Sequence, residues 1–182
     1  TPWTVTSTEP EPNYFTLHSA PPGLYSGPIG TIYGLGIAGL EHKAAERAYR
    51  ALSESFLEAA VHLTKERQHA GADRLSLTGS GLLGPLVALS SVAALESDHD
   101  TLRTVASLAS PLSAIAGTPR GLDIIDGASG AAIGLGRLFE LTNAEEYGAA
   151  QERMVQQLVD ALPAATTDHV PAVGMAHGLS GI

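Results

Sequence analysis

The sequence predicts an all-α protein built from repeated helical hairpins, and three observations support this. Hydrophobic residues make up 44% of the 182 residues but aromatic residues only 5%, which favours closely packed helices over an aromatic-rich β-sandwich. A glycine motif recurs four times, with its first glycines 54, 46 and 51 residues apart, at Gly27, Gly81, Gly127 and Gly178. Such a period is typical of repeat proteins in which each unit supplies one supersecondary element. Between the motifs, apolar residues recur every three or four positions, as in amphipathic helices.

The chain divides into a short first segment and one helical domain. Residues 1–22 contain five prolines and are predicted to form a Pro-rich linker or N-terminal extension. Residues 23–182 carry all four glycine motifs and are predicted to form the helical domain.

Three amphipathic helices are predicted between the glycine motifs. One covers residues 45–63, and one begins near Asp98, where Pro111 is predicted to kink the helix or end its first part. The third follows Asn143, which is predicted to be its N-cap. The apolar face of the first helix consists of Tyr49, Leu52 and Phe56, and that of the second consists of Leu102, Val105, Ala109 and Leu112. The apolar face of the third consists of Tyr147, Met154, Leu158 and Leu162.

Three further helices are predicted to start at the glycine motifs, at residues 30–40, 84–95 and 130–141. They are small and apolar almost all round, so we expect them to be buried. Their glycines cost about 0.8–1 kcal/mol each relative to alanine, which close helix–helix packing must offset.

The repeating unit is therefore a glycine turn, an inner helix and an outer helix, and the array is predicted to be an incomplete α/α toroid. In such a barrel the inner helices start at one rim. The polar residues that precede the first glycines are then predicted to converge there: Ser26, Ser80, Asp126 and His177.

Charge and composition exclude several partners and compartments. A net charge of −9 weighs against nucleic acid, because phosphate backbones require a basic surface. No run of eighteen apolar residues and no signal-like N-terminus is present, so no membrane contact is expected. The chain has no cysteine, which suits a cytoplasmic protein.

Three segments resemble the lanthionine synthetase C-like family. Residues 23–30 (GLYSGPIG) are similar to the family's opening repeat, and residues 123–130 (DIIDGASG) and 174–182 (GMAHGLSGI) carry its more specific motifs. The resemblance implies a double-layered toroid of seven helical hairpins, of which this chain supplies three and the beginning of a fourth. The chain is thus expected to be the N-terminal half of the toroid.

The resemblance also implies an activity. Members of the family are lanthipeptide cyclases: they add peptide cysteine thiols to dehydroalanine or dehydrobutyrine and so form thioether rings, a step of antibiotic biosynthesis on ribosomally made peptides. The implied partners are a dehydrated precursor peptide and a fused or separate kinase or dehydratase. Zinc, held in the family by two cysteines and a histidine, would need ligands outside this chain, so the cofactor is left open. The chain alone is expected to be inactive, and to self-associate or meet a second chain that completes the ring.

Two catalytic residues follow from the resemblance, His177 and Asp123. A histidine titrates near neutrality, so it can exchange the protons that ring closure requires. Asp123 is equally open to a structural role as a helix cap or to orienting the histidine. Asp126, Ser26 and Ser80 are interpreted as caps, and no metal ligand is assigned.

Two other functions remain open from the sequence. One is a non-catalytic, peptide-binding scaffold of the same shape, which the acidic surface fits equally well. The other is a different α/α-toroid enzyme, such as a glycoside hydrolase, which would need a pair of carboxylates or an aromatic-lined cavity.

Overall fold

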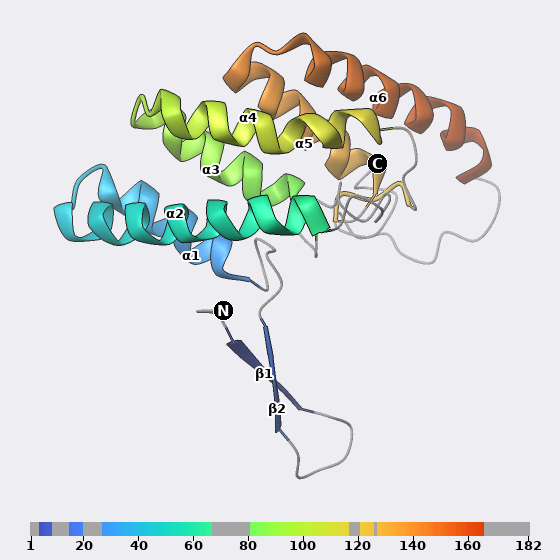
Figure 1. Cartoon of the computed structure of the whole chain (residues 1–182). Coiled ribbons are helices and arrows are strands. Elements are labelled where there is room, and N and C mark those ends of the chain that lie inside the picture. Colours follow the sequence, from blue (N-terminus) through green and yellow to red (C-terminus); the bar gives the residue numbers. More distant parts are fainter. Residues whose placement is uncertain are drawn as a thin grey trace.

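The computed structural model describes residues 4–8, 15–19, 27–66, 81–116, 121–125 and 127–165. Within these residues the chain forms six helices and one two-stranded sheet (Figure 1). The helices are α1 (Pro28–Gly39), α2 (Lys43–Glu66), α3 (Leu83–Leu95), α4 (His99–Ala114), α5 (Ala128–Thr142) and α6 (Glu145–Ala165).

The helices form two layers, as predicted for an all-α toroid fragment. Each inner helix packs on the outer helix that follows it, α1 on α2, α3 on α4 and α5 on α6. In the inner layer α3 contacts both α1 and α5, and in the outer layer α4 contacts both α2 and α6. The turns within the hairpins lie on one side of the array and the starts of the inner helices on the other (Figure 1).

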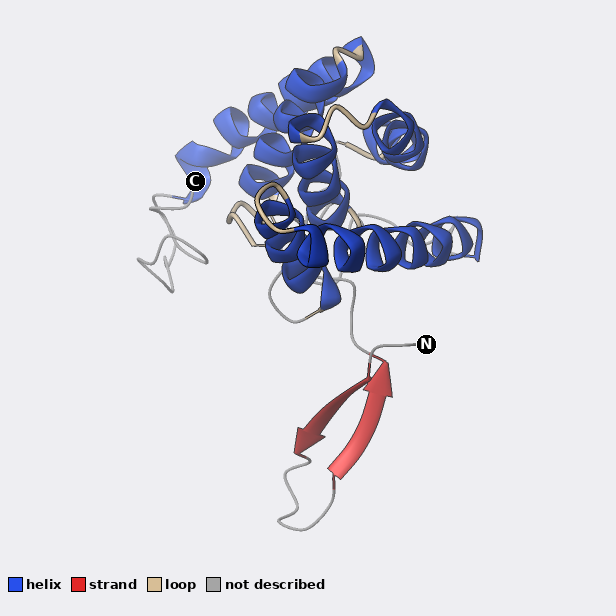
Figure 2. Ribbon diagram, turned by 90° about the vertical axis from the view of Figure 1, so that its left-hand side faces the viewer, coloured by secondary structure: helices blue, strands red, loops and turns tan. Residues whose placement is uncertain are grey.

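Residues 1–22, predicted to be a Pro-rich linker or N-terminal extension, contain a β-hairpin that was not predicted. Strands β1 (Thr4–Thr8) and β2 (Phe15–Ser19) pair in antiparallel fashion, with Thr6 opposite Leu17. The hairpin stands apart from the helices (Figure 2). Both strands are rich in threonine and other residues with high β-propensity, a signal that the five prolines of the segment concealed.

The outer helices lie where periodicity predicted them, with two differences. Pro111 lies inside α4, which continues to Ala114. Asn143 is the C-cap of α5, with φ 54°, and not the N-cap of α6; its N–H donates to the carbonyl of Phe139 at 2.7 Å. Asparagine adopts this left-handed conformation more readily than most residues, so it ends one helix instead of starting the next. The predicted start of a helix near Asp98 is confirmed: Asp98 is the N-cap of α4, and its side chain accepts the Thr101 N–H at 3.1 Å.

The three inner helices differ in how much of their surface is buried. α3 and α5 are buried along most of their length, as predicted. α1 buries only one face and exposes Tyr33, Ile37 and Leu40. α1 packs mainly against α2 and α3, whereas α3 lies between two inner helices and α5 contacts α4 as well as α3 and α6.

The glycines of α1 show where close packing offsets their low helix propensity. A Cβ on Gly36 would lie 2.6 Å from Cγ1 of Val92 on α3, and one on Gly39 would lie 2.9 Å from Cα of Glu46 on α2. Gly34 is different, because a Cβ there would meet nothing within 4 Å. Close approach therefore explains two of these glycines and not the third.

Two hydrogen bonds join α6 to α4 across about forty residues of sequence. The hydroxyl of Tyr147, a fully buried side chain, donates to the carbonyl of Ala106 at 2.6 Å. The guanidinium of Arg153 donates to the carbonyl of Ser113 at 2.8 Å. These partly buried bonds connect the second hairpin with the third.

Candidate functional site

Asp123 is the predicted catalytic residue that the structure describes. It lies in the turn formed by residues 121–125, directly before α5, on the side of the array where the inner helices begin (Figure 1). His177 lies outside the described residues, as do Ser26, Ser80 and Asp126. The convergence of these residues, and the pairing of Asp123 with His177, stay predictions.

The turn is fastened to the start of α5 through main-chain hydrogen bonds. The N–H groups of Ala128, Ser129 and Gly130 donate in order to the carbonyls of three turn residues, at 2.9, 3.4 and 3.3 Å. The acceptors are Gly121, Leu122 and Asp123. These amides belong to the first turn of a helix, where no helical carbonyl can accept them. The turn carbonyls therefore take the place that a capping side chain would have.

A capping role of Asp123 for α5 is consequently wrong. The N-cap residue is Gly127, and among residues 121–125 and 127–130 no side chain caps this helix end. The Asp123 carboxylate instead accepts the N–H of Ile125 at 2.8 Å, within its own turn. A half-buried carboxylate held in this way has a defined direction, as catalysis or the orientation of another group requires.

Gly127 allows the turn to approach the helix this closely. A Cβ at this position would lie 2.4 and 2.5 Å from the main-chain N and O of Asp123, and 2.8 Å from the carbonyl carbon of Gly121. Its φ of −102° and ψ of −172° are extended and open to any residue, so the requirement for glycine is steric. The first glycine of the motif is thus needed because the turn that carries Asp123 packs directly against it.

Sequence reasoning missed Ser129. Its side chain is buried, and its hydroxyl donates to the carbonyl of Leu122, seven residues earlier in the chain. The signal that could have found it is the repeat itself, because the matching positions in the first two motifs are the apolar residues Ile29 and Leu83.

The described residues do not fit a zinc site. No three His, Cys, Asp or Glu side chains among residues 27–66, 81–116, 121–125 and 127–165 are close enough to hold a metal ion together. The cysteine ligands implied by the family resemblance cannot come from a chain without cysteine.

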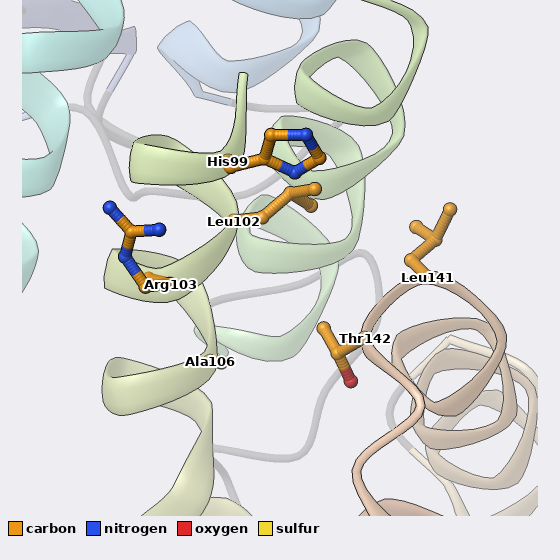
Figure 3. A pocket seen from close by; sticks show the side chains of 6 residues that line it. All are labelled: His99, Leu102, Arg103, Ala106, Leu141 and Thr142. Atoms are coloured by element: carbon orange, nitrogen blue, oxygen red, sulfur yellow. The ribbon is translucent and has the colours of Figure 1, made fainter. Parts of the chain in front are cut away.

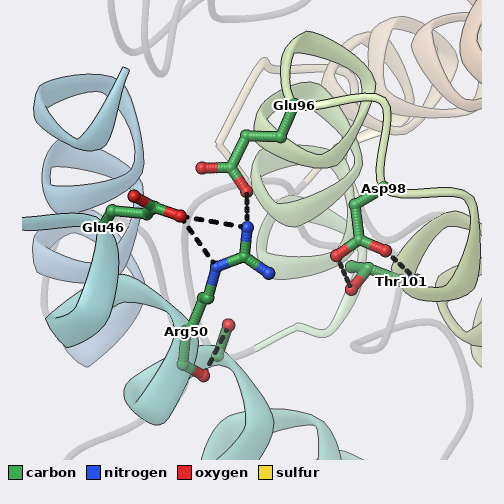
Figure 4. Close-up of polar contacts among 6 residues, drawn as sticks. Glu46, Arg50, Glu96, Asp98 and Thr101 are labelled. Carbon is green, nitrogen blue, oxygen red and sulfur yellow. Dashed lines mark hydrogen bonds and ion pairs between the residues drawn. The ribbon is translucent and has the colours of Figure 1, made fainter. Parts of the chain in front are cut away.

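A second polar cluster links α2 with the end of α3 (Figure 4). The Arg50 guanidinium lies 3.2 Å from Oε1 of Glu46 and 3.8 Å from Oε2 of Glu96. The Glu96 side chain is only 9% exposed, so burial raises its pKa, and the nearby Arg50 opposes the shift. Burial, followed by the charges of Glu96 and Asp98, raises the pKa of Tyr49 to about 12. Because Glu96 follows the last residue of α3, this cluster lies at the opposite helix end from the glycine turns.

A pocket of about 290 Å³ lies between the start of α4 and the end of α5 (Figure 3). Its lining consists of His99, Leu102, Arg103, Ala106, Leu141 and Thr142. Thr142 ends α5, whereas Asp123 precedes its start, so most of a helix of about 20 Å separates the two places. The pocket is therefore distinct from the predicted site.

Comparison with protein families agrees with the repeat and the motifs. Residues 18–182 match the family model described as lanthionine synthetase C-like protein. The chain belongs to this family. Membership of the lanthionine synthetase C-like family confirms the resemblance drawn from residues 123–130 and 174–182, and the match begins within β2. A comparison with curated protein sequences gave no match.

The length and hydropathy of the described helices of this lanthionine synthetase C-like protein bear on membrane insertion. None of them combines the length and the apolar character needed to cross a bilayer.

Proposed function

We propose that this lanthionine synthetase C-like protein is the cyclase part of a lanthionine synthetase. Its substrate would be a dehydrated precursor peptide, and its products thioether rings between cysteine and dehydroalanine or dehydrobutyrine. The observation that carries the proposal is Asp123, which belongs to a motif shared with the family and is held in a fastened turn where an inner helix begins.

The main contribution that this reaction needs from the protein is proton transfer. The thiol loses its proton, its sulfur bonds to the β-carbon of the dehydro residue, and the electron pair of the double bond moves toward the carbonyl as an enolate. The enolate then takes a proton at the α-carbon, so atoms balance and no oxidant or reductant is needed. A free thiol has a pKa near 8.5, so a group that titrates near neutrality accelerates the first step.

We assign the proton transfers to His177 and the orientation of that histidine to Asp123. A carboxylate that fixes an imidazole sets its tautomer and its direction. The half-buried Asp123, whose Oδ1 is already held by the N–H of Ile125, is suited to orientation more than to proton transfer. A kinase or dehydratase, fused or separate, would supply the dehydrated peptide, and the cysteine-free composition fits a reducing cytoplasm.

The proposal is tested with a synthetic peptide that carries one dehydroalanine and one cysteine, incubated with the complete protein. Ring closure leaves the peptide mass unchanged and removes the free thiol, so alkylation followed by mass spectrometry measures it. We expect His177→Ala to slow closure by about 100-fold. His99→Ala is the control, since His99 lines the separate pocket, and it should close rings at the wild-type rate.

Two results would speak against the proposal. Equal rates for wild type and His177→Ala would remove the role of His177. Binding of the peptide by the wild-type protein, without faster ring closure than in buffer, would favour the non-catalytic peptide-binding scaffold.

A further inference from the structure

Ser129 is a polar residue at a repeat position that is otherwise part of the core. Two residues after the first glycine, the first motif has Ile29 and the second Leu83, both 0% exposed. The third motif has Ser129, which is 5% exposed. A serine there forgoes the hydrophobic stabilisation that the other two repeats obtain, and a buried hydroxyl needs a partner. The fourth motif has serine again, at Ser180.

The partner of this hydroxyl belongs to the peptide group that precedes Asp123. Ser129 is the second residue of α5, so no helical carbonyl lies four residues before it. Its Oγ donates instead to the carbonyl oxygen of Leu122. The same carbonyl also accepts the Ser129 N–H, but at 3.4 Å, and the Asp123 carbonyl accepts the Gly130 N–H at 3.3 Å. Of these three contacts to the main chain on either side of Asp123, the one made by the hydroxyl is the shortest.

We propose that Ser129 is a positioning residue for Asp123. Its hydroxyl fixes the plane of the peptide group between Leu122 and Asp123, and this plane sets the direction in which the Asp123 side chain leaves the main chain. The carboxylate end is held separately by the N–H of Ile125 at 2.8 Å. The inference rests on the proposed function, because it assigns Ser129 to the orientation of the group that in turn orients His177.

Ser90 offers a matched control on the neighbouring inner helix. It is 0% exposed, and its Oγ donates to the carbonyl of Leu86 at 2.8 Å, four residues earlier within α3. Ser90→Ala thus removes another buried hydroxyl, with its hydrogen bond to a main-chain carbonyl, from the same layer. The difference is that the Ser90 hydroxyl bonds to its own helix, whereas the Ser129 hydroxyl bonds to the turn that carries Asp123.

The test measures kcat and KM for ring closure of the same synthetic peptide by the complete protein. We expect Ser129→Ala to lower kcat about tenfold with KM unchanged, since a displaced catalytic arrangement acts on the transition state. Ser129→Thr keeps the hydroxyl and should recover most of the rate, and Ser90→Ala should stay within about twofold of wild type. Hydrogen exchange at residues 121–125 should be faster in Ser129→Ala and unchanged in Ser90→Ala.

The outcomes separate this inference from the proposed function. If His177→Ala slows closure while Ser129→Ala changes neither kcat nor the exchange of residues 121–125, the proposed function stands and the role of Ser129 is overturned. If Ser129→Ala and Ser90→Ala lower kcat equally, the effect is general to the inner layer and the positioning role is again overturned. If wild type closes no rings, the proposed function fails, and the role of Ser129 in catalysis fails with it.

Discussion

Replacement of Gly127 by alanine tests whether position 127 must be glycine because the turn of residues 121–125 lies so close to the start of α5. The new Cβ would lie 2.4 and 2.5 Å from main-chain atoms of Asp123, about 1 Å inside ordinary contact distance. Because both atoms belong to the main chain, no side-chain rotation relieves the overlap. The turn must move away, which lengthens the three hydrogen bonds that cap α5.

The expected cost is about 2 kcal/mol in the free energy of unfolding, in the range measured for overpacked sites. For a chain of 182 residues this corresponds to a Tm lower by about 4–8 °C. The conformation of Gly127 is accessible to alanine, so strain in φ contributes nothing to the loss.

Gly34→Ala is the matched control, because it adds the same methyl group to a glycine with nothing within 4 Å of the new Cβ. Gly34 lies in the interior of α1, where alanine is favoured by about 0.8–1 kcal/mol, so this variant should be more stable than wild type. Urea unfolding followed by circular dichroism measures both variants. A Gly127→Ala protein as stable as wild type would refute the steric argument.

Three further predictions concern buried polar groups. Arg50→Ala should cost about 1 kcal/mol, because it leaves the Glu96 carboxylate without its cation, and Glu96→Gln in the same background should recover most of the loss. Folding raises the pKa of Glu96, so the protonated carboxyl is the form that favours the folded state. This stabilisation is complete below the pKa of the unfolded chain, near 4.5, and is lost as pH rises through the pKa of the folded protein. Glu96→Gln should therefore gain stability relative to wild type as pH rises above 4.5, measured by urea unfolding across pH. Tyr147→Phe removes the donor to the Ala106 carbonyl and should cost about 1 kcal/mol.

Each of these predictions has a control. Tyr33→Phe changes an exposed tyrosine in the same way and should leave stability unchanged, so an equal loss in Tyr33→Phe and Tyr147→Phe would contradict the role of the buried bond. A stability difference between Glu96→Gln and wild type that does not vary with pH would show that the pKa of Glu96 is not raised on folding. If Glu96→Gln gives no recovery in Arg50→Ala, the loss comes from Arg50 contacts other than Glu96.

Much of the fold could be read from local pattern. The outer helices follow from apolar residues every three or four positions, and the buried inner helices from small apolar runs, because both depend on neighbours within one turn of helix. The β-hairpin and the place of Asn143 could not be read in this way. Thr6 pairs with Leu17, which lies beyond the reach of helical periodicity, and Asn143, predicted to start one helix, instead ends the preceding one with a φ of 54°.

The sequence by itself determined the repeat, the two layers of helices and the family, since motif spacing and periodicity carry that information. The tertiary structure decided which residues the predicted site depends on. It showed that a side chain at position 127 would overlap the turn whereas one at position 34 would not, and that the Ser129 hydroxyl adds to the main-chain bonds that fasten the turn at α5. These distinctions rest on distances between segments that the chain brings together only when it folds, so no local pattern could contain them.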